Sequence, residues 1–296
     1  MIKKKSYFKE DEEKSRIWFE SWVKKLEELN GYNYQTKVIR TSLGQTQVYG
    51  LNWEDDSLPP LLIFPGFRTT TLIWDLDGGL ADLSKRFRLY LIETNGQPNL
   101  SEGNSPSIRS LDYGTWGGEV LDALGLEKAS IAGASFGGLV CMKIAIVNPD
   151  RIEAAYLFNP GCFRFVSLGW KNMYSNLLPI FKPSEKNIKK FLYNVVFSKP
   201  EHQLKPEAEA LLIEYLQYVI KNYKDRTEKP YYMGKQLDQV QTDVHLIVGS
   251  DDILIPYKKS VKRAKQHLGG HLKAVHILKA GHGIETSREA LGMILD

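Results

Sequence analysis

The amino-acid sequence predicts an α/β fold with a mostly parallel central sheet, helices on both faces and a helical insertion. Two observations predict this class. Short, wholly apolar runs alternate with segments of helical periodicity along most of the chain, and one interval of about 75 residues near residue 200 lacks clear strand signals. Apolar strands that alternate with helices are typical of parallel sheets that are covered on both faces.

The first 60 residues have a different pattern. Four apolar residues fall at steps of four, four and three and so share one helix face: Trp18, Trp22, Leu26 and Leu29. They predict a helix over 9–29, which the pair Asn30-Gly31 ends. Two strands follow, over 33–41 and 45–53, joined by a short turn. We therefore expect an N-terminal helical extension over 1–32.

The sheet is predicted from the apolar runs that follow. Six of them read as buried strands: 61–64, 89–92, 130–132, 154–158, 245–248 and 274–278. Helices are expected between them, including 72–85 and 115–124. The core of the fold then comprises 33–161 and 237–296. Ligands of such sheets bind beyond the carboxyl ends of the strands, so functional residues should directly follow the strands.

Residues 162–236 interrupt this alternation. Two groups of apolar residues have helical spacing: Ile188, Phe191, Leu192, Val195 and Val196, then Leu212, Tyr215, Leu216 and Val219. They predict a helical insertion that covers the ends of the strands as a lid. Its aromatic side chains, with Phe191 and Tyr215 as the candidates, suit an apolar acyl or aromatic substrate, although packing within the core explains them equally well.

Composition narrows the classes of function. The chain has 296 residues, 43% of them hydrophobic and 25% charged, with a formal charge of +4. No basic stripe interleaved with aromatic residues indicates a nucleic-acid partner. No apolar run approaches the 18 residues of a membrane span, and none follows the charged start of the chain as in a secretory signal. With two cysteines, a reducing compartment is expected, and the cytoplasm is the predicted location.

Motifs for metals and nucleotides are absent from the sequence. His267 and His271 are four residues apart, but Gly269-Gly270 between them disfavours the helix that would bring them together. Neither the glycine-rich dinucleotide motif nor the phosphate-binding loop occurs. We therefore expect no metal site and no cofactor.

The segment Gly133-Ala134-Ser135-Phe136-Gly137 carries the strongest functional signal. It follows a predicted strand and precedes a helical segment, which is the context of the G-x-S-x-G nucleophile elbow. A strand that turns abruptly into a helix leaves no room for side chains two positions either side of the serine. Its strained backbone exposes the serine hydroxyl, so Ser135 is the predicted nucleophile.

A serine hydroxyl needs a base that accepts its proton. His282 lies in Ala280-Gly281-His282-Gly283, just beyond the last predicted strand, and is the last of six histidines. That agrees with the chain order of serine, acid and histidine in this kind of site. His282 is therefore the predicted base.

The base in turn needs a carboxylate that fixes its tautomer. Asp251 and Asp252 both follow the strand predicted over 245–248. We favour Asp252, three residues after Gly249, and keep Asp251 as the alternative. The other common place for the acid, after the strand 154–158, reads Asn159-Pro160-Gly161 and has no carboxylate.

Two backbone N–H groups are the candidate oxyanion donors. Phe136 directly follows the nucleophile. Phe67 lies in the loop after the strand 61–64, where Gly66 permits a close approach.

Together, the ordered segments PGF, GASFGG, GSDDILIP and AGHG resemble the α/β-hydrolase superfamily in its lidded esterase-like branch. The resemblance covers residue 33 to the end of the chain, although the family commonly has His-Gly where this chain has Pro65-Gly66. It implies a serine hydrolase that cleaves a carboxylic ester or related acyl bond of a small molecule through an acyl-enzyme. The choice among ester, thioester, lactone and C–C bond stays open. The alternatives are an acyltransferase on the same triad and a catalytically idle ligand-binding sensor.

Overall fold

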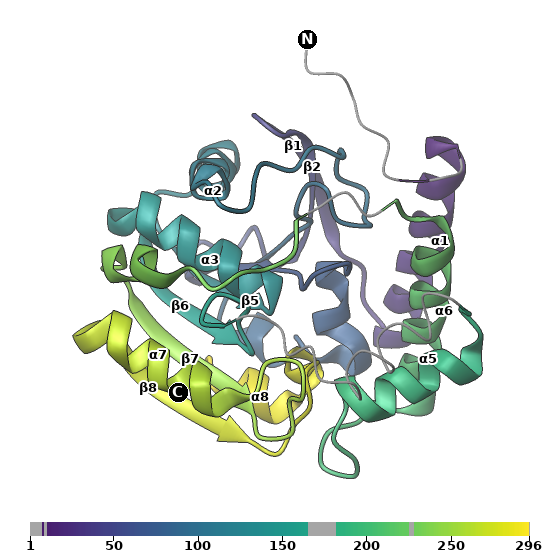
Figure 1. Ribbon diagram of the computed structural model, residues 1–296. Helices are drawn as coiled ribbons and strands as arrows, with labels where there is room; N and C mark the ends of the chain where they lie inside the picture. Colours follow the sequence, from purple (N-terminus) through teal and green to yellow (C-terminus); the bar gives the residue numbers. More distant parts are fainter. Residues whose placement is uncertain (1–7, 9–10, 165–181, 225–227, 296) are drawn as a thin grey trace.

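The computed structural model describes residues 8, 11–164, 182–224 and 228–295. In these residues, eight strands form one sheet with the order β1-β2-β4-β3-β5-β6-β7-β8 (Figure 1). The strands are β1 (Gln35–Thr41), β2 (Gly44–Leu51), β3 (Pro60–Phe64), β4 (Arg88–Ile92), β5 (Ala129–Ala134), β6 (Ile152–Phe158), β7 (Asp243–Gly249) and β8 (Leu272–Leu278). The pairs β1–β2 and β2–β4 are antiparallel, and all the others are parallel. The predicted α/β class and mostly parallel sheet are confirmed.

The central strands are buried on both faces of the sheet. In β3, Leu61 and Ile63 belong to one apolar cluster, whereas Leu62 and Phe64 belong to the other. Successive side chains of a strand point to opposite faces. A strand between two cores must therefore be apolar at every position, which explains why these strands read as continuous apolar runs.

Helices cover both faces, as predicted. One core contains residues of α2 (Asp112–Leu124), α3 (Phe136–Val147) and α7 (Tyr257–Leu268). The other contains residues of α1 (Glu12–Asn30), α5 (Glu185–Phe191), α6 (Pro206–Asn222) and α8 (Arg288–Gly292). Each helix thus buries its apolar side chains against the sheet or against a neighbouring helix.

The N-terminal helix α1 packs against α6 of the insertion (Figure 1). Trp22 donates its indole N–H to the carbonyl of Leu211 at 3.0 Å. The ring of Trp18 stacks on Tyr218, with the centroids 3.8 Å apart. Gly31 ends α1 in the left-handed conformation, which a residue without a Cβ adopts readily. The predicted helix and its end at Gly31 are therefore found, and the helix joins the insertion to the rest of the fold.

The prediction of one continuous helix over 72–85 is wrong. Two short 3₁₀ segments occupy this region, Thr71–Gly78 and Leu83–Lys85, and the first is broken by a non-helical backbone at Leu76 and Asp77. The cause is Asp75, a fully buried carboxylate that accepts the N–H of Leu80 and the hydroxyls of two tyrosines from the N-terminal region. A tertiary network overrides the helical periodicity here.

The insertion contains the two predicted helical segments. The first is α5, which continues into a π-helical turn at Leu192–Val196, and the second is α6. Residues 165–181 and 225–227 of the predicted lid lie outside the described residues, so the boundaries 162–236 and the covering role stay predictions. In the described chain, no helix has the length and apolar character needed to cross a membrane.

Candidate active site

Ser135 lies between β5 and α3, at the carboxyl end of a central strand. Its backbone has φ of 49° and ψ of −104°, a combination that non-glycine residues rarely adopt and that stores strain. A Cβ on Gly133 would lie 2.4 Å from the carbonyl carbon and oxygen of Gly137. The absence of side chains at these two positions is what lets the strand turn directly into the helix.

Gly137 also lets a second loop approach the turn. A Cβ here would lie 2.4 Å from the carbonyl oxygen of Phe64 and 2.7 Å from that of Pro65. A Cβ on Gly66 would lie 4.0 Å from the Cβ of Ser135. The loop after β3 is therefore held directly beside the serine.

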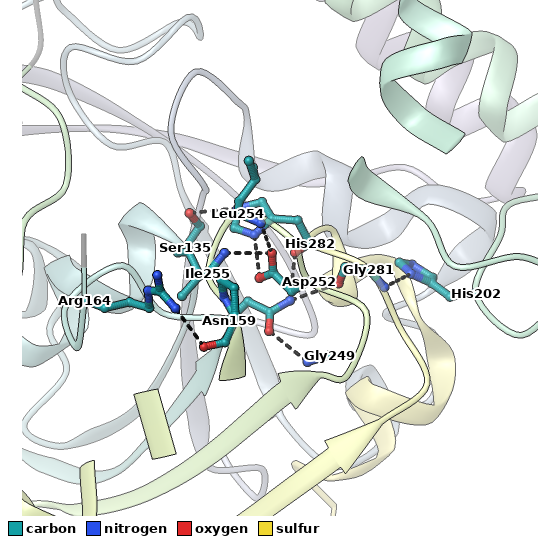
Figure 2. A network of polar contacts seen from close by, with 11 residues as sticks. Ser135, Asn159, Arg164, His202, Gly249, Asp252, Leu254, Ile255, Gly281 and His282 are labelled. Carbon is teal, nitrogen blue, oxygen red and sulfur yellow. Dashed lines mark hydrogen bonds and ion pairs between the residues drawn. The ribbon is translucent and has the colours of Figure 1, made fainter. Parts of the chain in front are cut away.

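The structure brings Ser135, His282 and Asp252 together in one hydrogen-bonded chain (Figure 2). The Oγ of Ser135 is 3.1 Å from Nε2 of His282. The Nδ1 of His282 is 2.8 Å from Oδ2 of Asp252. The carboxylate of Asp252 is fully buried, and its other oxygen accepts the N–H groups of Leu254 at 2.8 Å and Ile255 at 2.9 Å. Both oxygens are thus fixed, which fixes the ring of His282 in turn.

The neighbouring aspartate points elsewhere. Asp251 forms an ion pair with Lys279 at 2.8 Å and accepts a hydrogen bond from the hydroxyl of Ser198. These contacts hold its pKa below the usual range, with the hydrogen bond from Lys279 as the largest cause. Of the two candidate acids, Asp252 is the one that the structure places on His282.

The environment of His282 favours its protonated form. Burial lowers the pKa of this imidazole, but the charge and hydrogen bond of Asp252 outweigh burial and raise it above 6.5. The nearby carboxyl group of Glu285 acts in the same direction. A histidine whose pKa is raised accepts a proton from serine more readily than a free imidazole does.

Two backbone N–H groups beside Ser135 are available for an oxyanion. Phe136 is the first residue of α3, where backbone N–H groups lack intrahelical acceptors. Phe67 lies in the loop after β3, and its ring contacts that of Phe136 with the centroids 5.9 Å apart. Among the described residues, no backbone–backbone hydrogen bond outside the helices and strands uses either N–H as donor. The assignment of these donors stays a prediction that this arrangement supports.

Sequence reasoning missed the residues that hold the Phe67 loop. Gln97 accepts the N–H of Arg68 at 2.7 Å. The buried carboxyl group of Glu93 accepts hydrogen bonds from the hydroxyls of Thr70 and Thr71. Burial raises the pKa of Glu93 to about 7, although both hydroxyls oppose the shift. These polar residues follow β4, and that position after a strand is the signal that could have identified them.

Asn159 is a second residue that the sequence reasoning passed over. It directly follows β6 and is 1% exposed. Its Nδ2 donates to the carbonyls of Gly281 and His282, each at 3.0 Å, and its Oδ1 accepts the N–H of Gly249 at 2.8 Å (Figure 2). One amide thus joins the end of β7, where the acid loop begins, to the loop of the base. The sequence showed only that this position lacks a carboxylate.

The two aromatic candidates of the insertion are placed differently. Tyr215 is fully buried against Phe19 and Trp22 of α1, and its hydroxyl donates to the carbonyl of Pro98 at 2.8 Å. Phe191 is half-buried against the same core. Packing accounts for Tyr215, and neither residue has a described contact with Ser135, His282 or Asp252.

Comparison with known families agrees with the fold. Residues 59–284 match the model of the alpha/beta hydrolase fold family, which is most of the chain. The chain belongs to the α/β-hydrolase family. Solved α/β-hydrolases from Bacillus subtilis share its architecture. The carboxylesterase CesB (YbfK) superposes with a TM-score of 0.75 and 20% identity over 95% of this chain and 97% of that one. The naproxen esterase has a TM-score of 0.75 and 21% identity over 95% and 98%.

Curated relatives of this α/β-hydrolase match over shorter lengths. The uncharacterized carboxylesterase nap of Bacillus subtilis (strain 168) is 34% identical over 122 residues, 41% of this chain and 39% of that protein. The chain thus matches about two fifths of the length of that relative. A pimeloyl-[acyl-carrier protein] methyl ester esterase of Nitrosomonas europaea is 25% identical over 215 residues, 67% of this chain and 79% of that protein.

Proposed function

We propose that this α/β-hydrolase is a carboxylesterase with Ser135 as nucleophile, His282 as base and Asp252 as the acid that orients the base. The observation that carries the proposal is the hydrogen-bonded chain from Ser135 through His282 to Asp252, at 3.1 Å and 2.8 Å. It starts at a serine on a strained turn, where the hydroxyl is exposed for attack. Curated relatives that are named as carboxylesterases support the same class of reaction.

The first half of the proposed reaction transfers the acyl group to the enzyme. The Oγ of Ser135 forms a bond with the ester carbonyl carbon while Nε2 of His282 takes the hydroxyl proton. The carbonyl oxygen becomes an oxyanion, which the N–H groups of Phe67 and Phe136 stabilise. The bond to the alkoxy group then breaks, and His282 gives its proton to the departing alcohol. Asp252 stabilises the imidazolium throughout and keeps its own charge.

The second half repeats these steps with water. Water attacks the acyl carbon, its proton passes to Nε2 of His282, and the same N–H groups stabilise the second oxyanion. The bond to Oγ breaks, Ser135 regains its proton, and the carboxylic acid leaves. This sequence needs only a small-molecule acyl substrate and water, and no cofactor takes part.

The test is hydrolysis of p-nitrophenyl esters of increasing acyl length by the native protein and by Ser135→Ala. The variant should lose about 10³-fold or more of the rate. Circular dichroism should be the same for both proteins. Equal rates would rule out Ser135 as the nucleophile. Products should be analysed with and without an added alcohol, because a dominant transfer to the alcohol would indicate an acyltransferase instead.

A further inference from the structure

A tight turn of the insertion lies against the loops that carry the acid and the base. The turn comprises residues 198–202 and is closed by two backbone hydrogen bonds between Ser198 and His202, at 3.1 Å and 2.7 Å. Two of its polar side chains are directed at the core domain, since Ser198 is 8% exposed and His202 is 2% exposed, whereas Lys199 and Glu201 are exposed. Such burial of polar groups requires specific partners.

His202 links Gly281 and Gly283, the two residues on either side of the proposed base His282. Its Nδ1 accepts the N–H of Gly281 at 3.3 Å, which assigns the ring proton to Nε2 (Figure 2). Nε2 lies 2.9 Å from the hydroxyl of Thr286, and that hydroxyl donates to the carbonyl of Gly283 at 3.0 Å. This series of hydrogen bonds therefore starts at Gly281, on one side of His282, and ends at Gly283, on the other side. Burial lowers the pKa of His202 to about 4. The neutral ring that these hydrogen bonds require therefore persists at neutral pH.

The π-helical turn that precedes residues 198–202 binds the same loop through its backbone. The N–H of His282 donates to the carbonyl of Val195 at 2.9 Å, and the N–H of Gly283 donates to that of Val196 at 3.0 Å. A Cβ on Gly281 would lie 2.5 Å from the carbonyl oxygen of Val196. A π-helical turn frees carbonyl groups from the regular helical pattern, and here they become acceptors for the loop of the base.

Residues 198–202 also contact the loop that carries the proposed acid, Asp252. The hydroxyl of Ser198 donates to the carboxylate of Asp251, which pairs with Lys279, the residue directly after β8. Asp251 adjoins Asp252 in the chain. Ser198 and His202 thus fix the two loops whose relative position sets the distance between His282 and Asp252.

We propose that residues 198–202 of the insertion position the acid–base pair, with His202 as a positioning residue for His282. The insertion then contributes to catalysis by fixing the geometry of the base, in addition to any covering role. This inference rests on the proposed function of His282. It makes no claim that His202 touches the substrate.

The test compares three variants. In His202→Ala, the N–H of Gly281 loses its acceptor, and kcat should fall about 10- to 100-fold with KM changed less than about threefold. His202→Asn retains an oxygen at the Nδ1 position as acceptor for Gly281 but loses the link to Thr286, so it should recover kcat to within about tenfold of the native value. Thr286→Val cuts the bridge at its second link and should lower kcat about threefold to tenfold, which gives a second measurement if His202→Ala does not fold.

A matched control separates positioning from stability. Trp22→Phe removes a partly buried hydrogen bond between α1 and the insertion, far along the chain from residues 198–202. It should lower the melting temperature and leave kcat unchanged. Native kcat in His202→Ala, or a folded His202→Asn no better than His202→Ala, would overturn the proposal.

A second readout does not depend on turnover. Amide hydrogen exchange at Gly281 and His282 should be faster in His202→Ala than in the native protein, and native-like in Trp22→Phe. If the native protein hydrolyses no ester, the proposed function fails while this measurement still decides on the positioning. Unchanged exchange at both amides would overturn the inference by itself.

Discussion

The proposed nucleophile and the proposed base of the candidate site are held in place in two different ways. Ser135 is fixed by its own neighbours, since Gly133 and Gly137 allow the strand to turn into the helix. His282 is fixed by residues that are far away in the sequence. Asn159 contacts its loop across 123 positions and His202 across 79. The position of the serine is thus a local property of the chain, whereas that of the histidine depends on the assembled fold.

This difference separates two kinds of sensitivity. A change near Ser135 acts through the shape of one turn and its contact with the loop of Phe67. A change in any of several distant segments acts on His282 through hydrogen bonds to its backbone. The four predictions that follow test whether the two mechanisms are separate.

The largest effect is expected at the acid. Asp252→Asn should lower kcat about 10³- to 10⁴-fold, because the tautomer of His282 is no longer fixed and its imidazolium loses a charge partner. Steady-state hydrolysis of a p-nitrophenyl ester measures this. Asp251→Asn is the matched control, since it removes the neighbouring charge but no contact with His282, and it should cost less than about tenfold. A reversed order of the two variants would move the acid to Asp251.

The next effect tests the local mechanism at the nucleophile. Gly137→Ala places a Cβ 2.4 Å from the carbonyl oxygen of Phe64, so the loop of Phe67 must move. Loss of one oxyanion donor costs about 10²- to 10³-fold in kcat, and we expect a loss of this size. Gly292→Ala, whose Cβ would meet nothing within 4 Å, should behave as the native protein. Native kcat in Gly137→Ala would contradict the close contact of the two loops.

A smaller effect tests the distant support of the base. Asn159→Ala removes three hydrogen bonds between the acid and base loops and should lower kcat about 10- to 100-fold. Asn95→Ala is a stringent control. Asn95 is also fully buried and bonded to Thr46, Gln45 and Glu102, but it has no contact with either loop. Both variants should lose stability in urea, about 1–3 kcal/mol per buried group left unpaired. Equal kcat in the two variants would show that Asn159 is structural only.

The smallest expected effect is a shift in the pH dependence of kcat/KM. With the neutral form of His282 as the proposed base, kcat/KM should fall as the pH decreases through its pKa, which lies above 6.5. Glu285→Gln removes a carboxyl group whose charge raises this pKa, although burial raises the pKa of Glu285 itself to about 7, so that charge is only partly present over the acid limb. The acid limb of the profile should therefore move to lower pH, by less than about one unit. A limb that stays in place or moves upward would contradict the contribution of Glu285.

Sequence reasoning succeeded where the signal is local. The strands of the central sheet were found because burial on both faces makes each run apolar. The elbow was found because its glycines are spaced by the turn itself. The choice of Asp252 over Asp251 rested on spacing within one loop, and the structure places Asp252 on His282.

Sequence reasoning failed where a residue far along the chain determines the local structure. The helical periodicity of 72–85 gave no sign that Asp75 would bind Tyr32 and Tyr34 and break the helix. Nothing in the sequence around His202 indicates a role, because Gly281 and Thr286 are about 80 residues further along. Asn159 was noted only for lacking a carboxylate, and its amide contacts required knowing which loops meet beyond β6.

The packing of α1 on α6 has a consequence for synthesis of the protein. Trp22 and the carbonyl of Leu211 are 189 positions apart. At the usual speed of translation, α1 leaves the ribosome about 10 to 40 s before its partner exists. For that interval the face that carries Trp18 and Trp22 has no helix to cover it, and it is exposed to aggregation or to chaperones. Helix α1 is therefore made well before α6 but can take its final place only after α6 exists.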